Sequence, residues 1–153
     1  MEYRSIINKI INKSFPILKN KRIFIIKFKS KIFVGGASHP LPFLRIIFIN
    51  PTIKNKYLKA ILIHELCHLE VFEKRRWLKY CFIEIAYWFN KRLREKEEKD
   101  TDKLAIKKGY AKDIYDLCNY LRKDKNRKEL IKYYLSPKEI RFYAKKIKKW
   151  QSF

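Results

Sequence analysis

Residues 55–74 constrain the fold of this chain most strongly, because they have the periodicity of a helix that packs against a core. Apolar side chains recur there at intervals of three and four residues, at Leu58, Ile61, Leu62, Leu66 and Leu69. Such a helix is stable when other elements cover its apolar face. With 153 residues, the chain is long enough for one compact domain around this helix and too short for two of ordinary size.

The residues before this helix change from a helical to an extended pattern. Residues 1–15 place polar side chains among apolar ones, which predicts a short amphipathic helix. β-Branched and aromatic residues then predict two short strands, near residues 22–28 and 31–34, and Gly35 and Gly36 are expected to end the second strand.

A third strand is predicted over residues 44–49, after a loop that holds Ser38, His39 and two prolines. Asn50 and Pro51 are expected to end this strand. The three segments form one block, and the chain returns to a helical pattern directly after it.

The residues beyond 74 are predicted to be helical almost throughout. The apolar block 77–89 indicates a central buried helix, and the alternative for it is shallow contact with a membrane surface. A break in the helical pattern is expected near residues 91–94, and Gly109 supplies a stop.

Two more helices follow Gly109. The first has one apolar face, made by Ile114, Leu117, Cys118 and Leu121. The second is predicted over residues 137–149, where Ser136 and Glu139 have the spacing of a capping box. The order of a helix, a block of strands and then helices predicts an α+β fold, with residues 1–153 as a single domain.

The chain is strongly basic, with 38 Lys and Arg against 15 Asp and Glu and a formal net charge of +23. Such a charge favours nucleic acid or an anionic membrane as a partner. Basic and aromatic residues interleave in the last third of the chain, but no recognisable nucleic-acid-binding pattern accompanies them. A lysine-rich solvated face is the simpler interpretation, so nucleic acid is not strongly indicated and weak contact with a membrane surface stays open.

Cysteine content and hydropathy indicate a soluble protein in a reducing compartment, so we expect it in the cytoplasm. The three cysteines include no CxxC pair. The longest apolar stretch, residues 78–89, is interrupted by Lys79 and Glu84. It is also shorter than the roughly 20 residues that span a bilayer.

His64, Glu65 and His68 form an H-E-x-x-H pattern inside the helix predicted at residues 55–74. Because a helix advances about 100° per residue, the two histidines share one face and can bind one zinc ion. The Glu65 carboxylate can accept the proton of a metal-bound water, which makes it a general base. The alternative is a helix whose histidines only pack or form hydrogen bonds, but the apolar flanking residues favour a metal site.

A catalytic zinc site normally has a third protein ligand. The remaining histidine, His39, lies upstream and is interpreted as a surface or loop residue. Cys67 points away from His68 on the helix and suits packing better than coordination. A downstream carboxylate is the remaining choice, and the acidic cluster offers Glu95, Glu97, Glu98 and Asp100.

Residues 98–105 (EKDTDKLA) resemble the second helix of the gluzincin metallopeptidases. The resemblance is to HtpX-like and CAAX-prenyl-protease-like peptidases, and above all to the small soluble minigluzincins. Those proteins carry E-x-x-A-D followed by x-x-A, and this chain fits with Thr101 in place of the alanine. The resemblance covers about residues 44–122, and it implies that Glu98 is the third zinc ligand and that Asp102 holds the free N–H of a ligating histidine.

The resemblance also implies a small zincin-like domain, in which a short three-stranded sheet packs on an active-site helix and a glutamate helix. Residues 44–49 would be the rim strand of the cleft, where a peptide adds as a further strand, with an ordinary core strand as the alternative. A histidine or tyrosine beyond the ligands would stabilise the oxyanion; Tyr110, Tyr115 and Tyr120 are candidates, and the sequence does not choose among them. Residues 123–153 lie outside the resemblance, as a basic helical C-terminal extension.

The implied activity is that of a zinc metalloendopeptidase with one catalytic zinc ion. It would hydrolyse a peptide or an unfolded protein by a metal-bound water, with Glu65 as general base. Two alternatives stay open: a latent or inactive zinc-binding gluzincin-like domain, and a basic module that binds nucleic acid or a membrane surface. The sequence leaves the oligomeric state open.

Overall fold

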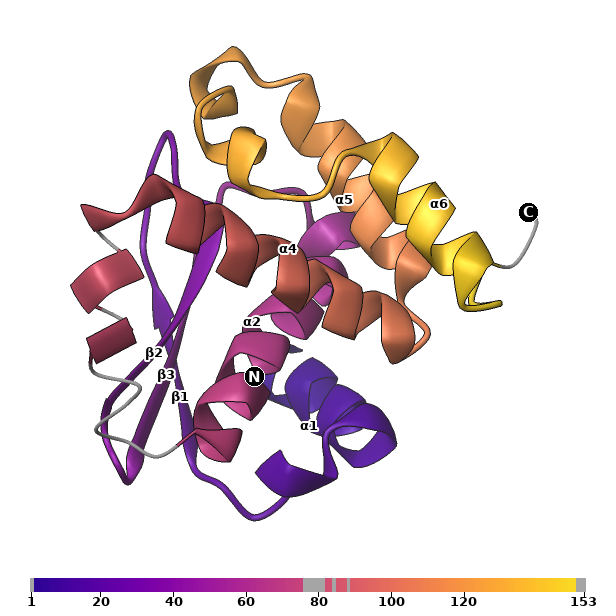
Figure 1. Ribbon diagram of the computed structural model, residues 1–153. Coiled ribbons are helices and arrows are strands. Elements are labelled where there is room, and N and C mark those ends of the chain that lie inside the picture. Colours follow the sequence, from indigo (N-terminus) through magenta and orange to yellow (C-terminus); the bar gives the residue numbers. More distant parts are fainter. Residues whose placement is uncertain (1, 76–81, 84, 88, 151–153) are drawn as a thin grey trace.

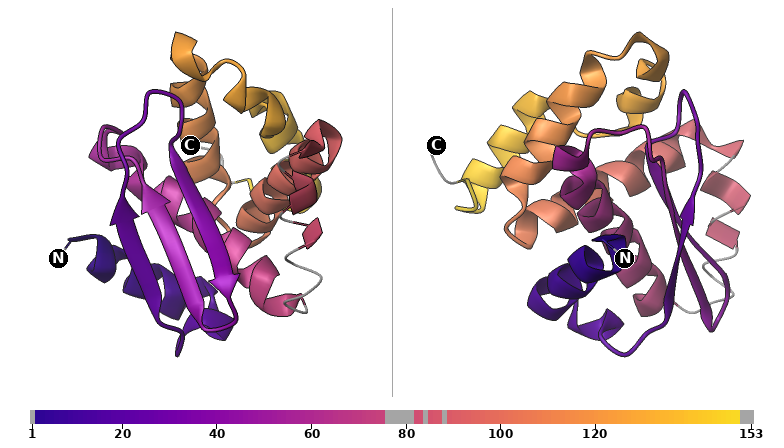
Figure 2. Two further views of the ribbon diagram at one scale, coloured as in Figure 1. Left: turned by 90° about the vertical axis from the view of Figure 1, so that its left-hand side faces the viewer. Right: turned by 180° about the vertical axis from the view of Figure 1, so that it is seen from behind.

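The computed structural model describes residues 2–75, 82–83, 85–87 and 89–150. Within these residues, helices pack on a three-stranded sheet, which confirms the predicted α+β class (Figure 1). The left view of Figure 2 shows the sheet in front and the helices behind it. No helix in this described part of the chain combines the length and the apolar character that crossing a membrane requires.

The sheet consists of β1 (Ile23–Lys27), β2 (Gly35–Leu41) and β3 (Leu44–Ile49), in the order β1-β3-β2. The central strand β3 pairs parallel with β1 and antiparallel with β2. Residues 44–49 are therefore not the rim strand expected from the resemblance, because both edges of β3 already carry a partner. β2 lies at one edge of the sheet.

The second strand lies at residues 35–41 and not at 31–34, so this prediction was wrong. The Ser30 hydroxyl accepts hydrogen bonds from two backbone N–H groups that follow it, at 3.0 and 3.2 Å, and these bonds fold the stretch into a turn. The predicted loop around Pro40 is part of β2 instead. An edge strand tolerates proline, because its outward N–H groups have no partner in the sheet.

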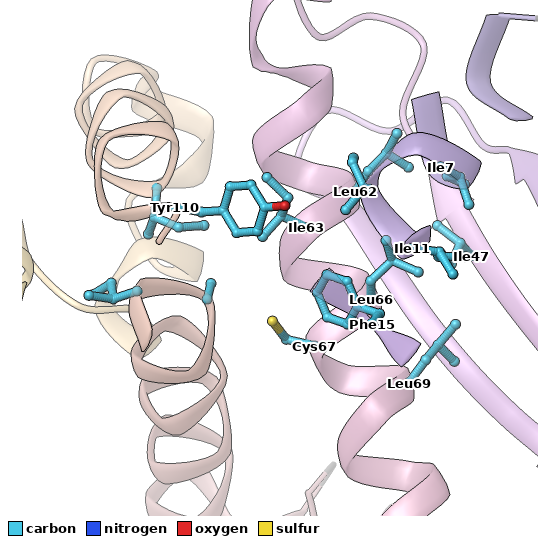
Figure 3. Close-up of a cluster of buried hydrophobic side chains, with 14 of the residues drawn as sticks. Ile7, Ile11, Phe15, Ile47, Leu62, Ile63, Leu66, Cys67, Leu69 and Tyr110 are labelled. Atoms are coloured by element: carbon cyan, nitrogen blue, oxygen red, sulfur yellow. The ribbon is translucent and has the colours of Figure 1, made fainter. Parts of the chain in front are cut away.

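Helix α2 (Leu58–Lys74) follows one 3-10 turn (Asn55–Tyr57) and confirms the helix predicted over residues 55–74. Helix α1 (Glu2–Ser14) is the predicted amphipathic helix and packs on α2. Figure 3 shows the apolar cluster that they build with the sheet, which includes Ile7 and Ile11 of α1, Ile47 of β3, and Leu62, Leu66 and Leu69 of α2. Cys67 is fully buried in the same cluster, as packing predicts.

The later helices are α4 (Lys91–Lys107), α5 (Ala111–Arg122) and α6 (Pro137–Lys146). The Asn90 side chain caps α4 by accepting a hydrogen bond from a backbone N–H three residues later, close to the predicted break. Gly109 has a φ of +92° and ends α4, because glycine adopts this left-handed conformation without steric cost. Ser136 and Glu139 form the predicted capping box at the start of α6.

The apolar block 77–89 is not a uniformly buried helix. Residues 76–81, 84 and 88 lie outside the described part of the chain. Among the described residues, Phe82, Ile85 and Phe89 are 60–88% exposed. Ile83 and Tyr87 line a cleft beside α2 instead. Because nearly every residue of this block is apolar, its sequence does not show which side chains face solvent.

Residues 123–150 contribute to the core of the domain. Their buried apolar side chains belong to the two core clusters and are Leu130, Ile131, Leu135, Ile140 and Ala144. The backbone N–H of Leu135 also donates to Asp102 of α4 at 3.0 Å. This part of the chain therefore supports the position of α4.

Candidate metal centre

Helices α2 and α4 lie against each other (Figure 1), and this packing brings His64, His68 and Glu98 together. The two histidines lie one turn apart on α2, and Glu98 reaches them from the second turn of α4. Oε2 of Glu98 lies 3.0 Å from Nε2 of His64 and 3.4 Å from Nε2 of His68, and the two Nε2 atoms are 3.1 Å apart. Three potential ligand atoms therefore form a nearly equilateral triangle in a largely buried place.

The spacing of this triangle is suitable for binding a metal ion. Tetrahedral zinc with bonds of 2.0–2.1 Å needs ligand atoms roughly 3.3–3.4 Å apart, and the three separations of 3.0–3.4 Å come close to this spacing. Without a proton or a metal ion between them, lone pairs on the two Nε2 atoms and the carboxylate oxygen repel one another at such distances. A cation in front of the triangle removes this repulsion, so these residues form a candidate metal centre.

Asp102 orients His64 from the side away from the triangle. Its Oδ1 lies 3.0 Å from Nδ1 of His64, and its Oδ2 accepts the backbone N–H of Leu135. With Nδ1 donating to Asp102, Nε2 of His64 presents its lone pair to the triangle. Burial lowers the pKa of His64, but in the metal-free site the hydrogen bonds with Asp102 and Glu98 outweigh this effect and raise the pKa well above its ordinary value, so a bound metal ion would have to displace the proton on Nε2.

Tyr87 holds the other oxygen of Glu98. Its hydroxyl donates to Oε1 of Glu98, which leaves Oε2 on the histidine side. Burial, followed by the charge of Glu98, raises the pKa of Tyr87, so the hydroxyl keeps its proton. No signal in the sequence points to this residue, because Tyr87 lies in an apolar block that contains no motif. It also precedes α4, the helix that carries Glu98, so helical spacing does not connect the two residues.

Glu65 lies on α2 beside the triangle and lines the same cleft. It is buried, and this burial raises the pKa of its carboxyl group. Gly35 of β2 lies directly against it, since a Cβ atom at Gly35 would be 2.8 Å from Oε1 of Glu65 and 2.7 Å from Cγ2 of Ile61. Because Gly35 has no side chain, the Glu65 carboxylate can lie directly against the backbone of β2.

Gly35→Ala should displace the Glu65 carboxylate, because both contacts are closer than real Cβ atoms allow. If Glu65 acts in catalysis, a shift of about 1 Å lowers kcat by roughly 10- to 100-fold. Steady-state cleavage of a peptide measures the change. Gly36→Ala is the matched control, since its Cβ meets only Phe48 at 4.0 Å, and a loss as large in Gly36→Ala would contradict the expectation.

A cleft of about 680 Å³ lies in front of these residues, between β2, α2 and the start of α4. Four consecutive residues of β2, numbers 35–38, line one wall of it. Arg75 and Glu97 also line it and form a two-pronged ion pair at 2.9 and 3.0 Å, so their charges offset each other. Much of the remaining wall is apolar, with Phe28, Ile32, Phe33, Phe48, Phe72, Ile83 and Leu130.

None of the three tyrosine candidates for oxyanion stabilisation lines the cleft. The Tyr110 hydroxyl pairs with Ser14 at 2.7 Å, Tyr115 accepts a hydrogen bond from Arg141, and Tyr120 stacks on Tyr57. Tyr134 lines the cleft instead, with its ring centroid 5.3 Å from that of His64. It follows the buried turn at residues 130–133, and no local pattern in the sequence connects it with α2.

The other ligand candidates do not join the triangle. Glu95 and Asp100 are partly exposed and pair with lysines, and Glu97 pairs with Arg75. His39 is neither on the surface nor in a loop, because it is buried in β2, with Nε2 3.2 Å from the carbonyl oxygen of Pro42. Glu98 is therefore the member of the acidic cluster that α4 turns toward the two histidines.

Comparison of the chain with protein-family models, with curated proteins and with solved structures gives no match. Its relation to the gluzincins therefore stays a prediction, and the function has to be inferred from the chemistry of the site.

Proposed function

We propose that this protein is a zinc-dependent metalloendopeptidase of the gluzincin kind. One observation carries the proposal: Nε2 of His64, Nε2 of His68 and Oε2 of Glu98 converge within 3.0–3.4 Å of one another, at the wall of a cleft that also contains Glu65. A buried triangle of two imidazoles and one carboxylate matches the ligand set of catalytic zinc sites that keep a position open for water or substrate.

His64, His68 and Glu98 would hold the zinc ion, and Asp102 and Tyr87 would keep two of these ligands in place. Zinc in such a site polarises the scissile carbonyl and makes a water molecule more acidic. Glu65 accepts the proton of the attacking water and donates it to the leaving amine. The burial of Glu65 suits this role, because a desolvated carboxylate is a stronger base than one in water.

The cleft suits an extended peptide. As an edge strand, β2 has backbone N–H and C=O groups without a partner in the sheet, and residues 35–38 line the cleft. A substrate can pair with this edge as an additional strand, and the apolar wall can receive its side chains. The pairing role implied for residues 44–49 thus passes to β2.

The test is proteolysis of an unfolded protein by the zinc-loaded chain. We expect fragments in mass spectrometry that disappear with a chelator and return with added zinc. Zinc bound at these residues without any cleavage would identify a latent or inactive zinc-binding domain instead. Salt-sensitive binding to nucleic acid or anionic vesicles, with no bound metal and no cleavage, would identify a basic binding module.

A further inference from the structure

Thr101 is a buried threonine of α4 that the proposed chemistry does not use. It lies one residue before Asp102 and three after Glu98, and only 3% of it is exposed. Its Oγ1 atom is 2.8 Å from the backbone oxygen of Glu97 and 3.3 Å from Nδ1 of His68. Among the described residues, Thr101 is the hydrogen-bond partner of this ring nitrogen.

The proton count at Thr101 decides the direction of both contacts. A hydroxyl group has a single proton to donate, and the backbone oxygen of Glu97 can only accept. The shorter contact with Glu97 takes this proton, which is the usual bond of a threonine to the carbonyl one helical turn earlier. Oγ1 then faces His68 with a lone pair, so Nδ1 of His68 must be the donor.

We propose that Thr101 is a positioning residue for the metal ligand His68. Its hydroxyl fixes the His68 tautomer with the proton on Nδ1, so that the lone pair of Nε2 points to His64 and Glu98. Asp102 does the same for His64, which means that adjacent residues of α4 orient both histidines of α2. The inference depends on the proposed metal site but not on peptidase activity.

Threonine has a reason to occupy this position. Alanine at this position would favour the helix more, because it has the higher helix propensity. It would, however, remove the hydroxyl group that accepts the hydrogen bond from Nδ1 of His68. A carboxylate in place of the Thr101 hydroxyl would also orient the His68 ring. It would, however, add a negative charge to a buried site that already holds Glu98 and Asp102. The threonine hydroxyl supplies an acceptor without that charge.

The test compares Thr101→Val, which removes the hydroxyl and keeps the shape, with Thr101→Ser, which keeps the hydroxyl. Competition with a chromophoric chelator measures zinc affinity without any substrate. We expect Thr101→Val to bind zinc about 10-fold more weakly, at the lower end of the range for lost outer partners of metal ligands. Thr101→Ser should stay within about twofold of the parent, because its hydroxyl can make both bonds.

A second measurement reports on His68 directly. In the zinc-loaded parent, nitrogen-15 NMR of the histidines should show the proton on Nδ1 of His68, exchanging more slowly with solvent than in Thr101→Val. Equal zinc affinity in the parent and Thr101→Val would overturn the inference, as would zinc bound through Nδ1 in the parent. If the parent binds zinc with this dependence on Thr101 but cleaves nothing, the peptidase proposal fails and the role of Thr101 stands. The parent spectrum decides the tautomer even if Thr101→Val does not fold.

Discussion

Glu65→Gln should lower the rate of peptide hydrolysis by at least about 100-fold, since a general base contributes roughly 10²- to 10⁴-fold to such reactions. Glutamine has nearly the same shape as glutamate but cannot accept and return the proton. None of the three proposed zinc ligands changes, so the variant should keep one bound zinc ion. Single-turnover cleavage measures the rate, and atomic absorption measures the metal content.

The fold should tolerate this substitution. Glu65 is buried and its pKa is raised by that burial, so a neutral amide in its place has a smaller desolvation cost than the carboxylate. Glu129→Gln is the control, because it makes the same chemical change at a side chain that is 84% exposed. A Glu65→Gln variant that cleaves peptides as fast as the parent would refute the proposed mechanism.

Glu98→Gln should remove most of the stabilisation that zinc confers on the parent. At a free zinc concentration about 100 times Kd, binding to the folded state alone adds about 2.7 kcal/mol to the free energy of unfolding. For a chain of this size, that corresponds to a rise in Tm of roughly 5–10 °C. An amide is a poor zinc ligand, so we expect a shift close to zero in the variant, measured by thermal unfolding with and without zinc.

The quantity to compare is the difference in Tm with and without zinc for each protein. The Tm without zinc can itself change, because Glu98→Gln alters the bonds to Tyr87 and His64 in the absence of metal. Glu95→Gln is the matched control on the same helix, since Glu95 is 47% exposed and pairs with Lys99. It should keep the full zinc shift. If Glu95→Gln abolished the shift and Glu98→Gln retained it, the ligand assignment would be wrong.

Local patterns were sufficient where the signal depends on neighbouring residues. The periodicity of residues 55–74, the stop at Gly109 and the capping box at Ser136 are all present in the structure, because helix registers and caps are set within a few residues. The second strand was misplaced because the position of a strand depends on pairing with residues that are not its neighbours in the sequence. β2 is defined by its pairing with β3, and Gly35, which looks like the end of a strand, allows its close approach to α2.

The residues of the candidate site also fall into two groups, those that local spacing predicts and those that depend on packing between helices. The H-E-x-x-H spacing alone predicts that His64 and His68 share one face of a helix with Glu65 beside them, because helical geometry fixes the angle between residues four apart. The acidic cluster left four candidate carboxylates. The resemblance selected Glu98, and the rotation of α4 against α2 turns Glu98 to the histidines and leaves the other three in ion pairs.

The partners of the proposed ligands follow from packing between separate segments of the chain. Tyr87 reaches Glu98, Thr101 reaches His68, and the backbone of Leu135 holds Asp102. Periodicity describes one helix at a time and carries no information about how two helices rotate against each other. The sequence therefore specifies the chemistry along α2, whereas the packing of α4, β2 and residues 130–135 on α2 determines the third corner of the triangle, the tautomers of both histidines and the edge of the sheet that faces the cleft.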